Sequence, residues 1–231
     1  MLAGVDGCRA GWLCVTLDVA RDELAHAVFP NAEALLMQQP LPDVIAVDIP
    51  IGLPAAGARD CDRLARRRLG RRGSSVFPAP LRPMLDAVDY ARACAIGAEI
   101  DGKRISKQAW NIVAKVREVD RVLRAQPSVA ARVVEVHPEL SFATWNRAPL
   151  EFSKKCDAGL GERRALIAGH FGPDAVAAIR SDWRVTDVAH DDIVDAFAAL
   201  WTAQRIGRGA AESLPPDPPL DAARMPMRIV T

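Results

Sequence analysis

Residues 43–49 (DVIAVDI) form a nearly continuous run of apolar, mostly β-branched side chains. Strands that helices cover on both faces show such runs, whereas half-exposed strands alternate apolar and polar residues. Pro50, Gly52 and Pro54 follow directly, and proline cannot donate to the hydrogen-bond ladder of a central strand. The run therefore predicts a short buried strand in the middle of an α/β sheet, with helices on both sides.

The other segments predict the order of elements around this strand. Strand-like stretches at 2–6, 12–19 and 24–29 precede it, and Asn31 then provides the N-cap of a short helix. The elements expected after it are helices over 59–72, 106–125, 161–180 and 191–206, a loop beginning at Arg71 (RRGSSVFPAPLRP), and a short buried strand over 132–137.

The length of 231 residues favours one sizeable domain. We expect this domain to span residues 1–210, with a basic helical insertion at about 55–128. Residues 211–231 are rich in proline. Their composition predicts a tail that lies on the surface or is disordered.

Composition narrows the classes of partner and compartment. Thirty Lys and Arg residues against 29 Asp and Glu leave a net charge of +1, so only local clusters can predict a nucleic-acid partner. One Tyr and six Phe argue against a surface that stacks single-stranded bases. Five cysteines without a CxxC pair favour a reducing compartment. Because no apolar run approaches the ~18 residues of a membrane span and MLAGVDG lacks a basic leader, we expect a cytoplasmic protein.

Acidic residues fall where an apolar core is expected. Asp6 ends the first strand-like stretch, Asp48 lies within the buried run, and Glu135 lies in the last short strand. A carboxylate in a buried strand costs several kcal/mol unless it is paired or holds a cation. Since Asp6 and Asp48 are expected on neighbouring strands, we interpret these acids as catalytic.

The final helix carries a second acidic group, HDDIVDA. Asp192 and Asp195 are spaced i, i+3 and share a helix face, although Asp191 alone would serve as a cap. Carboxylates without nearby His or Cys are hard oxygen donors that suit Mg²⁺ or Mn²⁺. We therefore expect Asp6, Asp48, Asp192 and Asp195 to hold a divalent cation, or two, as in phosphodiester cleavage.

The basic middle of the chain supplies a complement to phosphate. Residues 59–72 contain seven arginines, and the RRGSS segment offers Arg71, Arg72, Ser74 and Ser75 to a phosphate backbone. A solvated helix end followed by a plain turn explains the same residues. His137, just past a strand, is a candidate for contact with the scissile phosphate or for proton transfer.

Eight segments of this kind occur in one order. They are GVDGCRAGW, DIPIGLP, RxCDxxAR (from Arg59 to Arg66), RRGSSVFP, SKQAW, EVHPELSF, SKK (153–155) and HDDIVDAFAALW. Together, over about residues 3–207, they resemble the predicted ribonuclease H-like nucleases catalogued as domain of unknown function 429. Within these segments we assign Arg9, Lys107, Lys154 and Lys155 to substrate binding.

The resemblance implies a ribonuclease H-like α/β fold. Its five-stranded mixed sheet has the order 3-2-1-4-5, is flanked by helices, and carries the helical insertion between strands 4 and 5. More distantly, the layout is similar to RuvC-type Holliday-junction resolvases, which carry acids on the first and fourth strands and a pair opening the last helix. Those roles map onto Asp6, onto Asp48 and onto Asp192 with Asp195. The resolvases have Glu where this chain has Asp48, and Glu135 has no counterpart in them.

Three functions remain open on the sequence. The first is a nuclease dependent on Mg²⁺ or Mn²⁺. The second is an ATP-binding phosphotransferase of the actin and sugar-kinase class, whose phosphate-binding strand-turn resembles GVDGCRAG; its glycine-rich loops have no better match than CDAGLGE at 156–162. The third is a non-catalytic nucleic-acid-binding protein that keeps the fold. DNA, RNA and small nucleotides all remain candidate substrates, and a homodimer is compatible with the sequence.

Overall fold

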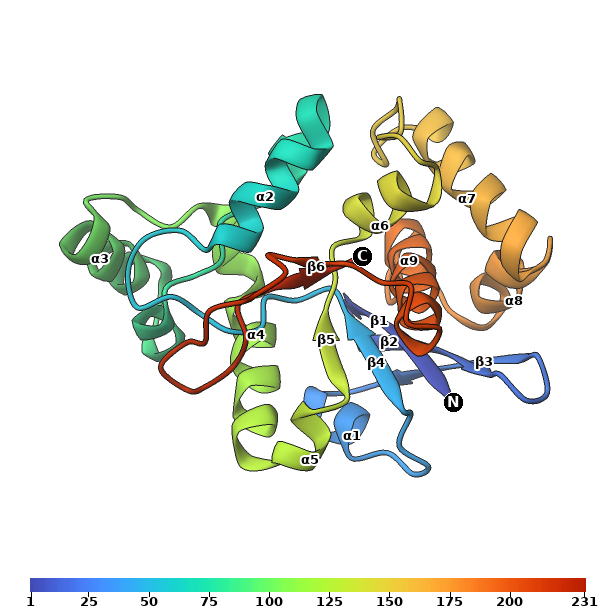
Figure 1. Cartoon of the computed structure of the whole chain (residues 1–231), viewed down its shortest axis with the longest axis horizontal. Helices are drawn as coiled ribbons and strands as arrows, with labels where there is room; N and C mark the ends of the chain where they lie inside the picture. Colours follow the sequence, from blue (N-terminus) through green and yellow to red (C-terminus); the bar gives the residue numbers. More distant parts are fainter.

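A mixed five-stranded sheet forms the centre of the protein. The computed structural model describes residues 1–231, and its strands follow the order β3-β2-β1-β4-β5 (Figure 1). The strands of this sheet are β1 (Leu2–Cys8), β2 (Gly11–Asp18), β3 (Glu23–Phe29), β4 (Val44–Val47) and β5 (Val133–Glu135). Strands β1, β2 and β3 pair antiparallel, whereas β4 pairs parallel to both β1 and β5. The predicted fold class and strand order are confirmed.

Helices cover both faces of the sheet, as the apolar run of the central strand predicts. The helices are α1 (Ala32–Leu36), α2 (Asp60–Leu69), α3 (Tyr90–Asp101), α4 (Lys107–Ala125), α5 (Pro127–Ala130), α6 (Pro138–Trp145), α7 (Asp157–Phe171), α8 (Ala175–Asp182) and α9 (His190–Gly207). Two 3₁₀ turns, η1 (Gly70–Ser75) and η2 (Arg82–Asp86), lie in the insertion between β4 and β5. None of the helices is long and apolar enough to cross a lipid bilayer.

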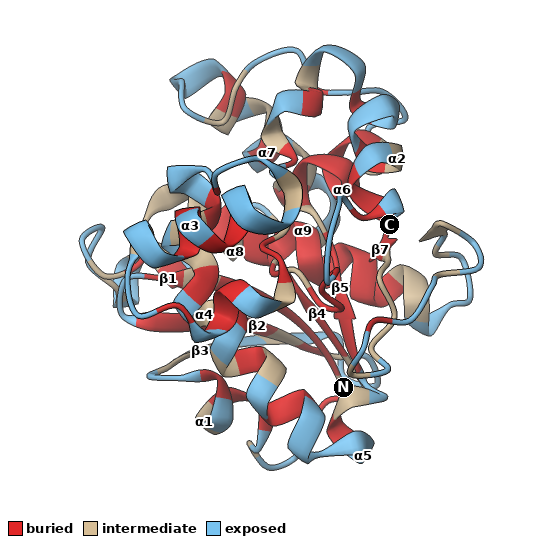
Figure 2. Cartoon of the chain, turned by 90° about the vertical axis from the view of Figure 1, so that its left-hand side faces the viewer, coloured by how far each residue is buried: buried red, intermediate tan, exposed pale blue.

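Two hydrophobic cores flank the sheet, and the strands divide their side chains between them. Val5 and Val47 face the core built with α1 and α4, whereas Leu2 and Ala46 face the core built with α9. Figure 2 shows the buried residues concentrated on the strands and on the helix surfaces that meet them. Because strand side chains alternate between faces, Asp6 and Asp48 point to the α9 side.

Helix α9 lies directly against β1. A Cβ atom on Gly4 would lie 2.1 Å from the backbone nitrogen of Leu200, so only glycine permits this approach. The helix is buried along most of its length and packs across β1 and β4. Helix α9 also packs on α6, where the Trp145 and Trp201 rings are stacked. The centres of the two rings lie 5.0 Å apart, and the angle between their planes is 4°. The beginning of α9 is therefore held at the carboxyl ends of β1 and β4.

Several boundaries differ from the sequence prediction. Strand β4 ends at Val47, so Asp48 follows the strand directly instead of lying within it. The expected loop at RRGSS forms the 3₁₀ turn η1. The predicted helix over 161–180 is two helices, α7 and α8, separated at Gly172 and Pro173, because proline cannot continue a helix that ends at a glycine C-cap.

The proline-rich segment 211–231 lies on the surface of the domain and is held there by defined contacts, which is the first of the two predicted alternatives. Val230 forms a bridge with Val136 next to β5, and the two-residue strands β6 (Ser213–Leu214) and β7 (Ile229–Val230) pair with each other. The Asp221 carboxylate accepts a 2.8 Å hydrogen bond from the Leu53 N–H and contacts Arg82. Proline removes ladder donors, but the apolar residues between the prolines still gain from burial.

Candidate active site

Four aspartates meet at the carboxyl ends of β1 and β4. Asp6 and Asp48 follow the paired residues Val5 and Val47 on parallel neighbours. Asp192 and Asp195 lie in the first two turns of α9, whose start reaches the same end of the sheet. The pKa of Asp6 is raised well above its ordinary value by burial first, and then by the negative charges of the other three. The structure therefore brings together the four residues predicted to hold a cation.

The four carboxylates differ in their hydrogen bonds. Asp6 Oδ1 accepts from the Gly7 N–H at 2.7 Å, and Asp192 Oδ2 accepts from the Ala189 N–H at 2.7 Å, where it caps α9. No protein group donates to the Asp48 carboxylate. Asp195 is 2% exposed, and its buried Oδ1 has no hydrogen-bond partner. An ionised oxygen without a partner is expensive in a protein interior, so this site has unused capacity for a proton or a cation.

Burial and mutual repulsion raise the pKa of the other acids too. Burial, followed by the charge of Asp195, raises the pKa of Asp48 to about 8. Burial raises the pKa of Asp192 to about 6, although its hydrogen bond from Ala189 opposes the change. Burial also raises the pKa of Asp195, against the nearby positive charge of Lys154. Clustered acids of this kind are more typical of functional sites than of structural ion pairs.

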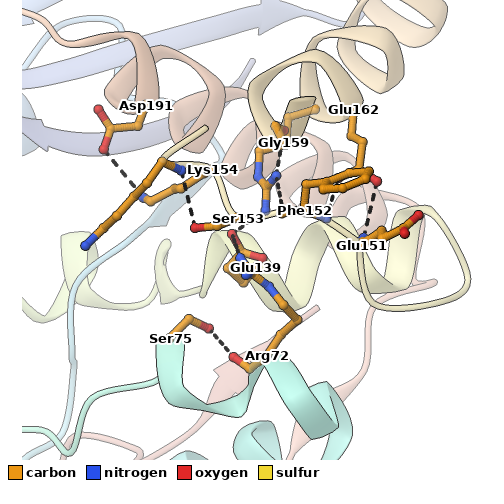
Figure 3. Close-up of polar contacts among 12 residues, drawn as sticks. Arg72, Ser75, Glu139, Glu151, Phe152, Ser153, Lys154, Gly159, Glu162 and Asp191 are labelled. Atoms are coloured by element: carbon orange, nitrogen blue, oxygen red, sulfur yellow. Dashed lines mark hydrogen bonds and ion pairs between the residues drawn. The ribbon is translucent and has the colours of Figure 1, made fainter. Parts of the chain in front are cut away.

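A lysine from the loop between α6 and α7 enters the aspartate cluster. The Lys154 ammonium contacts Asp195 Oδ2. It also lies 3.9 Å from Asp191 Oδ2 (Figure 3). Burial alone would lower the pKa of Lys154, but the charges of Asp195, Asp6 and Asp48 raise it above its ordinary range. In this structure the lysine neutralises part of the carboxylate charge, and its contact with substrate stays a prediction.

The residues at this site fit a divalent cation in charge and donor type. Asp195 has a buried oxygen without a partner, Asp48 has a carboxylate without a donor, and the ammonium of Lys154 already marks a place where positive charge is stable. Carboxylate oxygens are the ligands that Mg²⁺ and Mn²⁺ prefer. No three His, Cys, Asp or Glu side chains form a ready-made coordination shell. Binding of a cation therefore requires the side chains around Asp195 to rearrange.

Glu135 does not join the four aspartates. Its register partner on β4 is Val47, so its side chain points to the α4 face, opposite Asp6 and Asp48. There its two oxygens lie 2.6 and 2.7 Å from the Arg59 guanidinium, and the Ile51 N–H donates to it at 2.6 Å. Both of its carboxylate oxygens are occupied, and we assign Glu135 to the architecture of the sheet edge instead of to catalysis.

Two residues that were not predicted from the sequence, Arg59 and Asp62, belong to the network that holds Glu135. Arg59 is 3% exposed and also binds Asp62, with Nη2 at 2.6 Å from Asp62 Oδ1. A buried arginine saturated by two carboxylates is stable only when all partners remain. The RxCDxxAR segment contains a sequence signal for this network. Arg59 and Asp62 are spaced i, i+3 at the start of a basic helix, and this spacing favours an ion pair between them.

A second ion network lies between η1 and the aspartates. Glu139 Oε1 accepts from the buried Arg163 and lies 3.4 Å from Arg72 Nη2 (Figure 3). His137 Nε2 lies 3.3 Å from the Ser75 carbonyl oxygen. Since a carbonyl only accepts, Nε2 carries the proton and the buried Nδ1, which has no partner, keeps a lone pair. Burial lowers the pKa of His137 and keeps it neutral.

The remaining predicted substrate contacts are spread over the surface. Arg9, Arg71, Ser74 and Lys155 are exposed, and none of their side chains makes a hydrogen bond or ion pair. Arg9 follows β1, near Asp6. Lys107 belongs to the insertion, where its ammonium lies 3.8 Å from the centre of the Tyr90 ring.

The strand order and the acids at the carboxyl ends of β1 and β4 define the class: an α/β protein with a mixed 3-2-1-4-5 sheet and a carboxylate cluster at the start of its last helix. The chain belongs to the family described as "Protein of unknown function (DUF429)", whose model matches residues 4–220. No curated protein and no solved structure matches the sequence.

Proposed function

We propose that this protein is a nuclease that hydrolyses phosphodiester bonds with the help of a divalent cation. The observation that carries the proposal is the meeting of Asp6, Asp48, Asp192 and Asp195, with one buried carboxylate oxygen left without a partner. Pure binding to a polyanion gains nothing from such a cluster, since negative charge repels phosphate. A cation between the acids and the phosphate resolves this conflict.

The aspartates would hold Mg²⁺ or Mn²⁺, and one or two such cations supply activation of water and stabilisation of charge on the leaving oxygen. The protein fixes the ligands in place: Asp6 on the central strand, and Asp192 and Asp195 on a helix that Gly4 allows to press against it. His137 offers an unprotonated Nδ1 and is neutral, so it suits proton transfer near the site.

The insertion supplies the surface for the nucleic acid. Exposed arginines without a carboxylate partner line α2 and η1: Arg66, Arg67 and Arg71. Arg72 and Ser75 of η1 contact Glu139 and His137, which lie at the beginning of α6. Arginine side chains of this density bind phosphate backbones with a strong dependence on salt. A polymer lying on α2 and η1 would reach the aspartate cluster.

The phosphotransferase alternative is less well supported. The segment CDAGLGE, its nearest match to a glycine-rich nucleotide loop, forms the beginning of helix α7. Gly159 packs against the Ser153 carbonyl oxygen instead of facing an open loop.

We also propose that the protein is cytoplasmic, because all five cysteines are unpaired and four of them are buried, as a reducing compartment permits.

Calorimetric titration with Mn²⁺ tests the proposal directly. Wild type should bind Mn²⁺ and gain thermal stability with it, and Asp6→Asn should lose both effects. Asp217→Asn, a change at an exposed aspartate without contacts, is the matched control. Cleavage of a mixture of single- and double-stranded DNA and RNA should require Mn²⁺ and fall by orders of magnitude in Asp6→Asn. An absence of Mn²⁺ binding at millimolar concentration would refute the catalytic proposal.

Reversal of one arginine tests the nucleic-acid surface. Arg71→Glu should weaken nucleic-acid binding and flatten the dependence of the affinity on salt. Arg208→Glu makes the same charge change at the opposite end of α9, at an exposed residue, and should leave the salt slope as it is. Equal affinities and slopes in all three proteins would show that the arginines of η1 are a solvated surface and nothing more.

A further inference from the structure

Lys154 is held in the aspartate cluster by a loop that is anchored at several points. Glu162 of α7 accepts hydrogen bonds from the N–H groups of Glu151 and Phe152, at 3.2 and 3.0 Å (Figure 3). A Cβ on Gly159 would lie 2.0 Å from the Ser153 carbonyl oxygen, so the loop packs directly on the helix. The ammonium is therefore delivered to a defined place.

The Lys154 ammonium binds the carboxylate of Asp195, which a divalent cation at this site would also bind. Asp195 Oδ2 accepts a hydrogen bond from Lys154, and Asp195 Oδ1 has no hydrogen-bond partner. A cation at this carboxylate would meet the positive charge of Lys154 at short range, and like charges within a few ångströms in a poorly hydrated site repel strongly. The Lys154 side chain is 29% exposed, so its end has a path into solvent while the backbone stays anchored.

We infer that Lys154 is an internal counter-ion for the aspartate cluster, which keeps the site intact without metal and leaves Asp195 when a divalent cation binds. The inference rests on the proposed function, in that the cluster binds such a cation. Lys154 and the cation compete for the same charge, so the affinity for metal is set by how firmly the lysine is held. By linkage, each weakens the binding of the other equally.

Two substitutions at Lys154 test the competition. Lys154→Met keeps the length of the side chain and removes its charge, so Mn²⁺ affinity should rise, on the order of tenfold to a hundredfold, as couplings of this kind do. The same variant should be less stable without metal and should gain more thermal stability from Mn²⁺ than wild type. Lys154→Arg keeps the charge and binds carboxylates with two parallel hydrogen bonds, so it should bind Mn²⁺ more weakly than wild type.

The matched control is Lys155→Met, at the exposed neighbour whose side chain makes no contact, and its Mn²⁺ affinity should equal that of wild type. Binding is measured by calorimetry and by the electron paramagnetic resonance signal of free Mn²⁺, both independent of activity. Equal or weaker binding in Lys154→Met would overturn the inference and show that the lysine acts together with the metal. An absence of binding in wild type and in both Lys154 variants would instead refute the metal site, and the proposed function with it.

Discussion

Replacement of Asp48 by asparagine separates a functional charge from a structural one. Asn has nearly the same shape as Asp but carries no charge. No protein group donates to the Asp48 carboxylate, whereas its partial burial and the charge of Asp195 raise its pKa to about 8. In the absence of metal, the ionised side chain therefore destabilises the fold. We expect Asp48→Asn to be at least as stable as wild type and to lose cleavage activity by orders of magnitude.

The magnitude of the effect depends on pH. A tenfold change in proton affinity corresponds to about 1.4 kcal/mol, so the rise from 3.8 to about 8 sets an upper bound of about 6 kcal/mol. Asp48 is partly exposed, and solvent screening reduces the expected value to about 2 kcal/mol. Below pH 4 both states of the protein hold the proton and no cost arises. Between pH 4 and 8 only the native state keeps it, so wild-type stability falls as the pH rises.

Urea unfolding in a chelator at pH 4.5, 6.5 and 8.5 measures this cost. The stability of Asp48→Asn relative to wild type should grow with pH and reach about 2 kcal/mol at the highest value. Asp217→Asn, the exposed control, should follow wild type throughout. A variant that is less stable than wild type at pH 8.5, or a difference independent of pH, would refute the reasoning, because a structural carboxylate leaves its donors unpaired when it is neutralised.

Three further substitutions test the contacts that hold the sheet, helix α9 and segment 211–231 in place. The free energy of unfolding in urea is measured for each. Arg59→Met leaves Glu135 without its counter-charge, and we expect a loss of about 3–5 kcal/mol. Gly4→Ala places a methyl group 2.1 Å from the Leu200 backbone nitrogen, which forces α9 away and should cost about 3 kcal/mol. Asp221→Asn weakens the anchor of segment 211–231 by about 1–3 kcal/mol at neutral pH. Because the pKa of Asp221 is lowered in the native state, this last difference should shrink as the pH falls into the acid range.

Matched changes elsewhere serve as controls for the first two substitutions. Arg63→Met breaks only an exposed pair with Asp60 and should change stability by less than about 1 kcal/mol. Gly161→Ala lies in helix α7 with open space around it and should be neutral or slightly stabilising. A loss below about 1 kcal/mol in Arg59→Met would contradict the assignment of the buried network as structural.

The sequence predicts much of the fold because its strongest signals are local. The apolar run over 43–49 marks the buried strand β4, which pairs with strands on both sides, and Asn31 caps the helix that it was expected to cap. The strand order followed from the family resemblance instead, since pairing between β1 and β4 joins segments that are distant in sequence. Composition left two alternatives for segment 211–231, on the surface or disordered, because it does not show which apolar residues find a partner.

The structure brings part of the predicted site together and separates the rest, for a geometric reason. Asp6 and Asp48 share the α9 face because their strands are parallel and in register. Glu135 also lies in an apolar strand, but the register of β5 pairs it with Val47, so its side chain points to the opposite face of the sheet. A shift of one residue in the register would reverse that face, and the sequence alone does not show the register. Lys154 was assigned to substrate because a sequence does not show which carboxylate a loop lysine will meet.

The stacked pair of Trp145 and Trp201 gives the molecule an optical signature of its own. Two nearly parallel indole rings with centres 5.0 Å apart couple electronically, so this pair should contribute to the circular dichroism of the native protein, and the difference between wild type and Trp201→Phe isolates its contribution. The pair joins α6, which starts beside His137, to α9, which carries Asp192 and Asp195. Any substitution in the site that keeps this contribution has kept both helices in place, and a spectrum recorded before each assay separates lost chemistry from lost architecture.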